Sequence, residues 1–90
     1  MEISFDPVKR AAALQDRGLD FADAAIVFGG PVFTFEDTRI GYPERRFATY
    51  GLIGARLVAV IWTETRDGRR VISMRKANDR EHARYRHRLA

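Results

Sequence analysis

The first third of the chain carries the pattern of one short strand followed by two helices. Glu2–Phe5 is typical of a strand. Pro7–Arg17 is predicted to be a helix, because the aspartate before it can accept from free backbone N–H groups and Gly18 is a common helix end. From Asp20 onward, apolar residues recur at i, i+3, i+4 and i+7, which predicts a second helix with one buried face. The Gly-Gly-Pro at 29–31 ends it.

After residue 31 the pattern changes to strands, with one final helix. Four strands are predicted, over Val32–Phe35, Arg45–Gly51, Arg56–Glu64 and Arg70–Lys76. Residues 36–43 are polar and turn-rich, so they are expected to form a loop in which Glu36-Asp37 is solvated. Leu57–Trp62 is apolar on both faces, which places it at the centre of the sheet. Asn78 is predicted to cap the last helix, with Glu81 at its third position.

These elements predict one α+β domain over residues 1–90, in the order β-α-α-β-β-β-β-α. We expect an antiparallel β-meander sheet with two N-terminal helices and a C-terminal helix. No apolar run approaches the ~20 residues needed to cross a bilayer, so we expect a cytoplasmic protein without a membrane partner. The absence of cysteine excludes disulfides and thiolate zinc sites. No pattern of carboxylates, histidines or glycines indicates a metal or a cofactor.

Turn geometry predicts which side chains share a face of the sheet. We expect a two-residue hairpin at Asp67-Gly68 and a four-residue loop over 52–55. With both turns in place, the residues on one face are Arg45, Trp62, Ser73 and Arg75. Lys76 would point to the other face, or lie at the end of its strand.

Two arginines on one face of a sheet can hold a phosphate and the additional charge of a transition state. Arg45 and Arg75 are the residues that the predicted register brings together. The alternative is that they pair with acids such as Glu44 and Glu64, or are simply solvated, as most surface charges are.

Positive charge is concentrated at the end of the chain. Residues 66–90 contain nine Lys and Arg against three acids, whereas residues 1–65 contain seven and nine. Such asymmetry indicates a polyanionic partner. Arg80, Arg84 and Arg88 recur at i, i+4 and i+8 along the last predicted helix and could follow an RNA backbone. Tyr85 or Trp62 could stack on a base, although Tyr85 is more often a residue that docks a helix on a sheet.

Several short segments, in this order and spacing, resemble the BrnT family, the toxin half of a type II toxin–antitoxin pair. The segments are Phe5-Asp6-Pro7-Val8-Lys9, Gly18-Leu19-Asp20-Phe21-Ala22-Asp23-Ala24, Val27-Phe28, Glu44-Arg45-Arg46-Phe47, Gly51, Ile72-Ser73-Met74-Arg75-Lys76-Ala77, Arg80, Glu81 and Tyr85. The family often has Lys-His-Gly where this chain has Asp16-Arg17-Gly18, and Asn where Ala13 stands. The missing histidine argues against a role for imidazole there.

The resemblance implies a RelE-like fold and an RNA-cleaving activity that inhibits translation. It also implies a BrnA-type antitoxin that binds the toxin, in assemblies of two toxins with two antitoxins, and contact with DNA only through that antitoxin. The positions carried over are Arg45, Arg75 and Lys76, followed by Arg80, Arg84 and Tyr85.

The resulting hypothesis is a metal-independent endoribonuclease in which Arg45 and Arg75 clamp the phosphate. Lys76 would act as base or acid if neighbouring cations depress its pKa, with Glu44 as a reserve base. Composition alone supports a nucleic-acid-binding module without catalysis equally well. A third hypothesis is a domain that only binds protein, with the basic last helix docking onto an acidic antitoxin segment.

Overall fold

The computed structural model describes residues 2–39 and 41–90, and in these residues it shows one five-stranded sheet with three α-helices. The elements are β1 (Glu2–Phe5), α1 (Pro7–Arg17), the 3-10 helix η1 (Phe21–Asp23), α2 (Ala24–Gly29), β2 (Val32–Asp37), β3 (Arg46–Ile53), β4 (Arg56–Glu64), β5 (Gly68–Lys76), α3 (Asp79–Tyr85) and the 3-10 helix η2 (Arg86–Arg88). The chain is therefore of the mixed α+β class, as predicted. None of the described helices is long and apolar enough to cross a membrane.

Local capping explains where the first helices begin and end. The Asp6 carboxylate accepts from the backbone N–H of Val8 at 2.8 Å, and Gly18 closes α1 with a φ of 68°. These are the predicted bounds of the first helix. The predicted second helix divides into two pieces: Asp20 caps the single 3-10 turn η1, and α2 is only six residues long.

The sheet has the order β1-β5-β4-β3-β2, with β4 at its centre as its apolar sequence predicts. Strands β2 to β5 form an antiparallel meander, as expected, and β1, whose pairing was not predicted, pairs with β5 in parallel. Gly68 permits this pairing, because a side chain there would overlap the backbone of Glu2.

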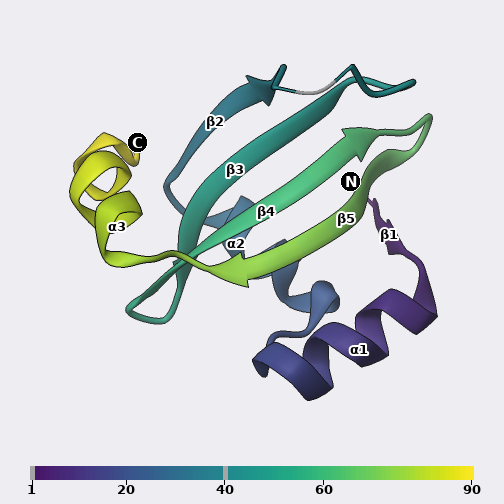
Figure 1. The fold of residues 1–90 in the computed structure, drawn as a ribbon, viewed down its shortest axis with the longest axis horizontal. Helices are drawn as coiled ribbons and strands as arrows, with labels where there is room; N and C mark the ends of the chain where they lie inside the picture. Colours follow the sequence, from purple (N-terminus) through teal and green to yellow (C-terminus); the bar gives the residue numbers. More distant parts are fainter. Residues whose placement is uncertain (1, 40) are drawn as a thin grey trace.

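Two apolar clusters lie on the two faces of the sheet. Helices α1 and α2 cover one of these faces (Figure 1). The larger one joins the sheet to residues 13–28 and contains Val58, Val60 and Met74, all fully buried. The smaller one, on the opposite face, contains Tyr50 and Ala59 and is partly covered by the end of the chain. Helix α3 stands at the end of the sheet where β5 finishes.

The turn between β3 and β4 differs from the predicted four-residue loop. Ile53 pairs with Arg56, so the turn consists of Gly54 and Ala55, and Gly54 adopts a φ of 61°. Phe47 consequently faces Trp62, where Arg45 was expected. A shift of two residues leaves every side chain on its predicted face.

A bulge in β5 has the larger consequence. Trp62 pairs with Val71 but Ile61 pairs with Ser73, so Ile72 is an extra residue in the ladder. The predicted hairpin between β4 and β5 is present, but its turn spans residues 65–68, so Asp67-Gly68 is not its two-residue loop. An extra residue reverses the facing of every later residue in its strand. Residues from Ser73 onward therefore lie on the face opposite to the predicted one.

Candidate active site

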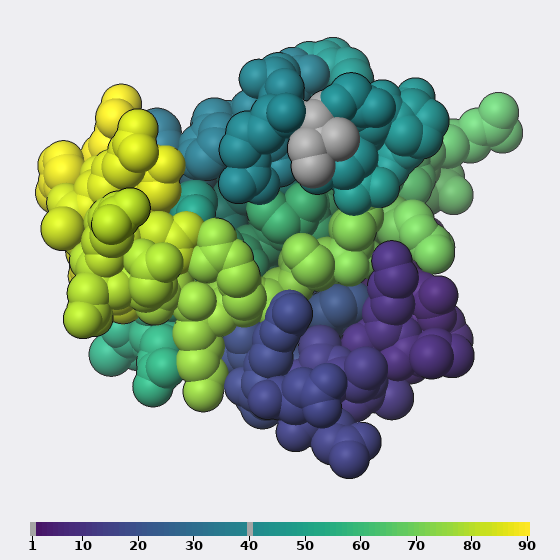
Figure 2. All heavy atoms as spheres, in the orientation of Figure 1, coloured from purple at the N-terminus to yellow at the C-terminus, as the bar shows by residue number. Residues whose placement is uncertain are grey.

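A cleft of about 440 Å³ opens on the face of the sheet that carries Tyr50. Figure 2 shows it as a hollow between the C-terminal residues, in yellow, and the segment around β2 and the loop after it, in teal. The lining residues are Phe35, Asp37, Arg39, Ala48, Tyr50, Ile61, Arg75, Asn78, Arg80, Glu81, Arg84 and Tyr85. Four of these are arginines and two are acids, so the cleft is positively charged.

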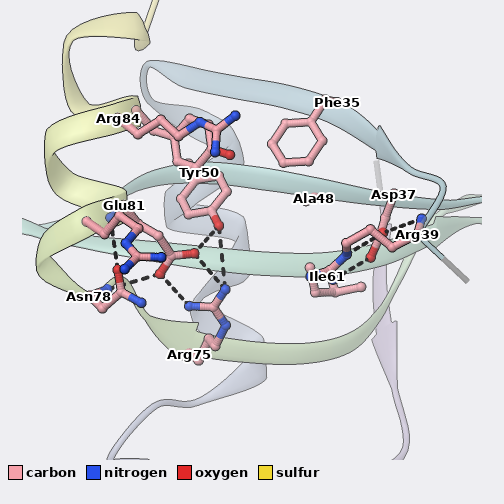
Figure 3. A pocket seen from close by; sticks show the side chains of 12 residues that line it. Phe35, Asp37, Arg39, Ala48, Tyr50, Ile61, Arg75, Asn78, Glu81 and Arg84 are labelled. Atoms are coloured by element: carbon pink, nitrogen blue, oxygen red, sulfur yellow. Dashed lines mark hydrogen bonds and ion pairs between the residues drawn. The ribbon is translucent and has the colours of Figure 1, made fainter.

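At one end of the cleft, Arg75 grips Glu81 with both ends of its guanidinium group (Figure 3). Its Nη1 donates to Oε1 at 2.6 Å, and its Nη2 donates to Oε2 at 2.7 Å. These hydrogen bonds lower the pKa of Glu81 to about 2 and raise that of Arg75, although burial opposes both shifts. The pair is therefore fully charged near neutral pH.

Tyr50 completes this group. Its hydroxyl donates to Oε2 of Glu81, and the Nη2 of Arg75 lies 3.5 Å from the hydroxyl oxygen. Only 4% of the residue is exposed. Burial, followed by the hydrogen bond to Glu81, raises the pKa of the phenol to about 12. Tyr50 therefore stays protonated and acts as a donor that orients the carboxylate.

The start of α3 explains why Glu81 lies here. Asn78 accepts from the N–H of Glu81 at 2.9 Å, and Oε1 of Glu81 accepts from the N–H of Asn78 at 3.0 Å. This is the capping box predicted from the sequence. The same carboxylate thus closes the helix and holds Arg75, so the position of α3 and the orientation of the arginine depend on each other.

The other end of the cleft holds a second ion pair, between Asp37 and Arg39. Arg39 Nε donates to Oδ1 and its Nη2 donates to Oδ2, both at 3.0 Å. Asp37 is only 6% exposed, so the expectation that it is solvated is wrong. It terminates β2 beneath the arginine, whose hydrogen bonds lower the pKa of the carboxyl. The loop predicted over residues 36–43 therefore begins two residues later than expected.

Two further arginines line the cleft from α3. Arg80 and Arg84 have no ion-pair partner among residues 2–39 and 41–90. The guanidinium carbon of Arg84 lies 5.5 Å from the centre of the Tyr85 ring. Tyr85 itself packs on Tyr50 at 4.3 Å between ring centres and on Phe33 at 5.6 Å. It docks the helix on the sheet, which was the structural alternative for this residue.

The structure separates the sequence-predicted site residues into two groups. Those brought together in the cleft are Arg75, Arg80, Arg84 and Tyr85. The others, which do not line it, are Arg45, Lys76, Arg88 and Trp62. The expectation that Arg45 and Arg75 share one face is wrong, because the bulge in β5 places Arg75 opposite Ala59. Glu44, the reserve base, pairs with Arg46 outside the cleft.

The residues outside the cleft have other surroundings. Arg45 pairs with Glu36 at 2.9 Å. Trp62 is 7% exposed, donates to the Thr49 hydroxyl at 2.8 Å and packs in the helix-side core. Lys76 pairs with Val58 at the end of β5 and faces the same way as that residue. Arg88 lies in η2, beyond the end of α3, and its guanidinium carbon is 4.5 Å from the centre of the Phe33 ring.

The sequence interpretation missed three polar residues of the cleft: Asp37, Arg39 and Tyr50. It predicted the capping role of Glu81 but not its ion pair with Arg75. Asp37 and Arg39 were placed in a solvated loop, and Tyr50 was not considered. The alternation of the strand around Tyr50 was the one available signal for it, because a tyrosine on a half-buried face needs a hydrogen-bond partner. Across the described ranges 2–39 and 41–90, no group of three or more acidic or histidine side chains is arranged to hold a metal ion.

Comparison with known proteins assigns the chain to a family. A search of curated proteins found no match. The profile of the family described as "Ribonuclease toxin, BrnT, of type II toxin-antitoxin system" matches residues 5–81, which include the Tyr50–Arg75–Glu81 group and most of the cleft. The match covers more than half of the chain, and the chain belongs to the BrnT family of ribonuclease toxins from type II toxin–antitoxin systems.

Proposed function

We propose that the chain is an endoribonuclease that cuts RNA without a metal cofactor and that the cleft is its catalytic site. In this reaction the 2′-hydroxyl oxygen attacks the adjacent phosphorus, and the bond from phosphorus to the 5′ oxygen breaks. The products end in a 2′,3′-cyclic phosphate and a 5′-hydroxyl. Reactions of this class depend on positioned charge, which arginine side chains supply.

The bidentate pairing of Arg75 with Glu81 is the observation that carries this proposal. A guanidinium group held in this way is oriented for two parallel hydrogen bonds, and a phosphate accepts the same pattern as a carboxylate. The scissile phosphate would take over these donors when RNA enters the cleft. Arg75 would then stabilise the charge that develops on the phosphorus oxygens.

Glu81 is the base in this scheme. Its pKa of about 2 is caused first by the hydrogen bonds from Arg75, so transfer of those donors to the phosphate raises it toward the ordinary range. A carboxylate with a higher pKa is a better acceptor for the proton of the 2′-hydroxyl. The 5′ oxygen takes up a proton from solvent as it leaves. Tyr50 continues to donate to Glu81 and keeps the carboxylate in place.

The remaining arginines of the cleft bind substrate. Arg80 and Arg84, which have no ion-pair partner in the described ranges, contact phosphates on either side of the scissile bond. Arg45 and Lys76, which the sequence suggested for the same chemistry, lie outside the cleft and take no step here. The proposal thus places one arginine, Arg75, at the scissile phosphate, where two were expected.

We also propose that the fold is RelE-like and that RNA cleavage by this chain inhibits translation. Its partner would be a BrnA-type antitoxin, in a complex of two toxins with two antitoxins, and DNA would be bound only by the antitoxin. The family assignment supports the existence of an antitoxin and an RNA substrate. A direct test is whether the product of a short neighbouring reading frame relieves growth arrest caused by this chain.

The catalytic proposal is tested with purified protein and single-stranded RNA in the presence of EDTA. We expect fragments whose 5′-hydroxyl ends are labelled by polynucleotide kinase without phosphatase treatment. Fragments that appear only after a divalent metal is added would contradict metal independence. Binding without fragments would support the non-catalytic nucleic-acid module instead. If RNA is neither bound nor cut, the chain acts only as a protein-binding domain.

A further inference from the structure

The end of the cleft farther from Arg75 has no role in the proposed reaction, although it is built from a buried acid, an arginine and an aromatic ring. We propose that Phe35, Asp37 and Arg39 form a subsite for the base of a bound nucleotide and that this subsite prefers guanine. This inference rests on the proposal that the cleft binds RNA, and it adds which base lies beside the bound phosphate.

The orientation of Arg39 is the first observation. Asp37 accepts from its Nε and Nη2, and the Arg39 backbone N–H lies 3.3 Å from the same carboxylate. These contacts use one edge of the guanidinium group. The second donor edge, formed by Nη1 and the other hydrogen of Nη2, has no partner within the part of the chain that the structure describes. Arg39 is 79% exposed at its side chain, whereas Asp37 beneath it is buried.

An arginine held at one edge can present two parallel donors at the other. Guanine carries two adjacent acceptors, O6 and N7, that match this spacing, and the bidentate pairing of arginine with guanine is the commonest specific contact to a base. Adenine has a donor in place of O6 and cannot complete the pair. In single-stranded RNA this edge of the base is free of pairing and open to side chains.

The surroundings of Arg39 suit a flat apolar ring. Phe35 is 36% exposed and lines the cleft on one side, while Ala48 and Ile61 line its floor (Figure 3). A base that lies on the floor beside Phe35 could stack on that ring. A second phosphate at this position would gain the arginine but would leave the apolar wall and floor without contacts. The combination of an apolar surface and one oriented guanidinium group therefore favours a nucleobase over a second phosphate at this position.

The register of the sheet places this subsite next to the proposed phosphate site. Tyr50, Ala59 and Arg75 are cross-strand neighbours, and Phe35, Ala48 and Ile61 form the adjacent row. Adjacent rows on one face are separated by two residues, or about 6.7 Å. Figure 3 shows Arg75 and the Asp37–Arg39 pair at opposite ends of this floor. A nucleotide with its phosphate on Arg75 can therefore direct its base toward Arg39.

Binding of short oligonucleotides tests the proposal without requiring cleavage. The probes are fluorescently labelled pentanucleotides in which two uracils lie on each side of one central base. All five sugars are 2′-deoxyribose, because the proposed reaction requires a 2′-hydroxyl. The central base is guanine, inosine, 7-deazaguanine or adenine. Inosine keeps O6 and N7, and 7-deazaguanine lacks N7. We expect guanine and inosine to bind equally, and the other two to bind roughly tenfold more weakly.

Three variants complete the experiment. Arg39→Ala should remove the differences among the four oligonucleotides, and Arg39→Lys should do the same while keeping the positive charge beside Asp37. Arg66→Ala, which removes an exposed arginine from the turn between β4 and β5, should leave the preference intact. Equal binding of all four oligonucleotides by the wild-type chain would overturn the inference. So would an equal loss of affinity for all four in Arg39→Ala with the preference retained, since that result indicates a phosphate contact.

The outcome is separable from that of the catalytic proposal. Ribose versions of the same oligonucleotides report cleavage in a parallel assay. If none is cut but guanine is preferred in binding, the subsite stands and the catalytic proposal fails. If all are cut at equal rates and bound equally, the catalytic proposal stands and the subsite fails.

Discussion

Arg45 and Arg75 lie on opposite faces of the sheet. The guanidinium carbon of Arg45 is 5.3 Å from the centre of the Phe47 ring, which stacks on Trp62 in the helix-side layer. Arg75 lies opposite Ala59 and reaches Glu81 on the other face. The two guanidinium groups therefore cannot hold one phosphate together, and the chemistry of the cleft falls to Arg75.

This separation predicts unequal effects of removing the two arginines. Arg75→Gln should lower kcat for RNA cleavage by about 10²–10³-fold, the usual cost of losing one donor to a developing oxyanion. Arg45→Gln should change kcat by less than about threefold, since an exposed ion pair of this kind contributes little. Arg75→Gln leaves the Glu81 carboxylate without its cation, so circular dichroism and thermal unfolding must show that the variant is folded. A loss of activity in Arg45→Gln equal to that in Arg75→Gln would contradict the geometry.

Glu81 makes stability depend on pH in acid. Its pKa is about 2 in the folded chain against an ordinary value of 4.5, so between these values the unfolded chain binds more protons. The contribution of Glu81 to the free energy of unfolding should therefore be complete above about pH 5. It should be lost progressively as the pH is lowered toward 2. One such group contributes a slope of up to about 1.4 kcal/mol per pH unit.

Comparison with Glu81→Gln isolates this contribution. The variant keeps a side chain of the same shape but has no proton to bind, so its stability should fall less steeply between pH 5 and pH 2. Asp20, whose pKa is also lowered to about 2 by Arg10, contributes equally to both proteins. Urea unfolding across this range measures both slopes. Identical slopes would show that Glu81 is not held by Arg75 in solution.

Arg80 and Arg84 of α3, which have no ion-pair partner in the described part of the chain, should determine how salt affects RNA binding. Each phosphate contact to single-stranded RNA contributes about 0.7 to the slope of log affinity against log salt. Arg80→Ala and Arg84→Ala should each reduce the slope by about that amount, because both residues line the cleft. Arg66→Ala removes the same charge from a residue that does not line the cleft and should leave the slope unchanged. A uniform reduction in all three variants would indicate a diffuse charge effect rather than contacts.

Gly51 controls the packing of the sheet on α2. A Cβ at this position would lie 2.7 Å from Cγ1 of Val27 and 3.3 Å from the carbonyl oxygen of Pro31. Gly51→Ala should therefore lower the free energy of unfolding by about 1–3 kcal/mol through overpacking. Gly29→Ala is the matched control, since a Cβ there meets nothing within 4 Å. Equal unfolding midpoints for the two variants in urea would refute the predicted overlap.

Local signals in the sequence predicted the elements well. The bounds of α1 followed from Asp6 and Gly18, and the capping box of α3 followed from Asn78 and Glu81. These features depend on residues within a few positions of each other, so their geometry is set by the local backbone. The central position of β4 followed from its apolar residues on both faces. The shape of the candidate site could not be predicted in the same way.

The sequence by itself determined the class of the fold, the concentration of positive charge toward the end of the chain and the resemblance to the BrnT family. The tertiary structure decided which charges meet. Ile72 enters β5 as an extra residue, and this reverses the facing of Arg75 and brings it to Tyr50 and Glu81. Such a register change depends on how the two faces of β4 and β5 pack across the whole sheet. Val71 and Met74, three residues apart, both face the helix-side core, so the alternation breaks at Ile72. Apolar pattern alone does not reveal this break, because Ile72 and Met74 would form an equally regular apolar face in a strand without a bulge.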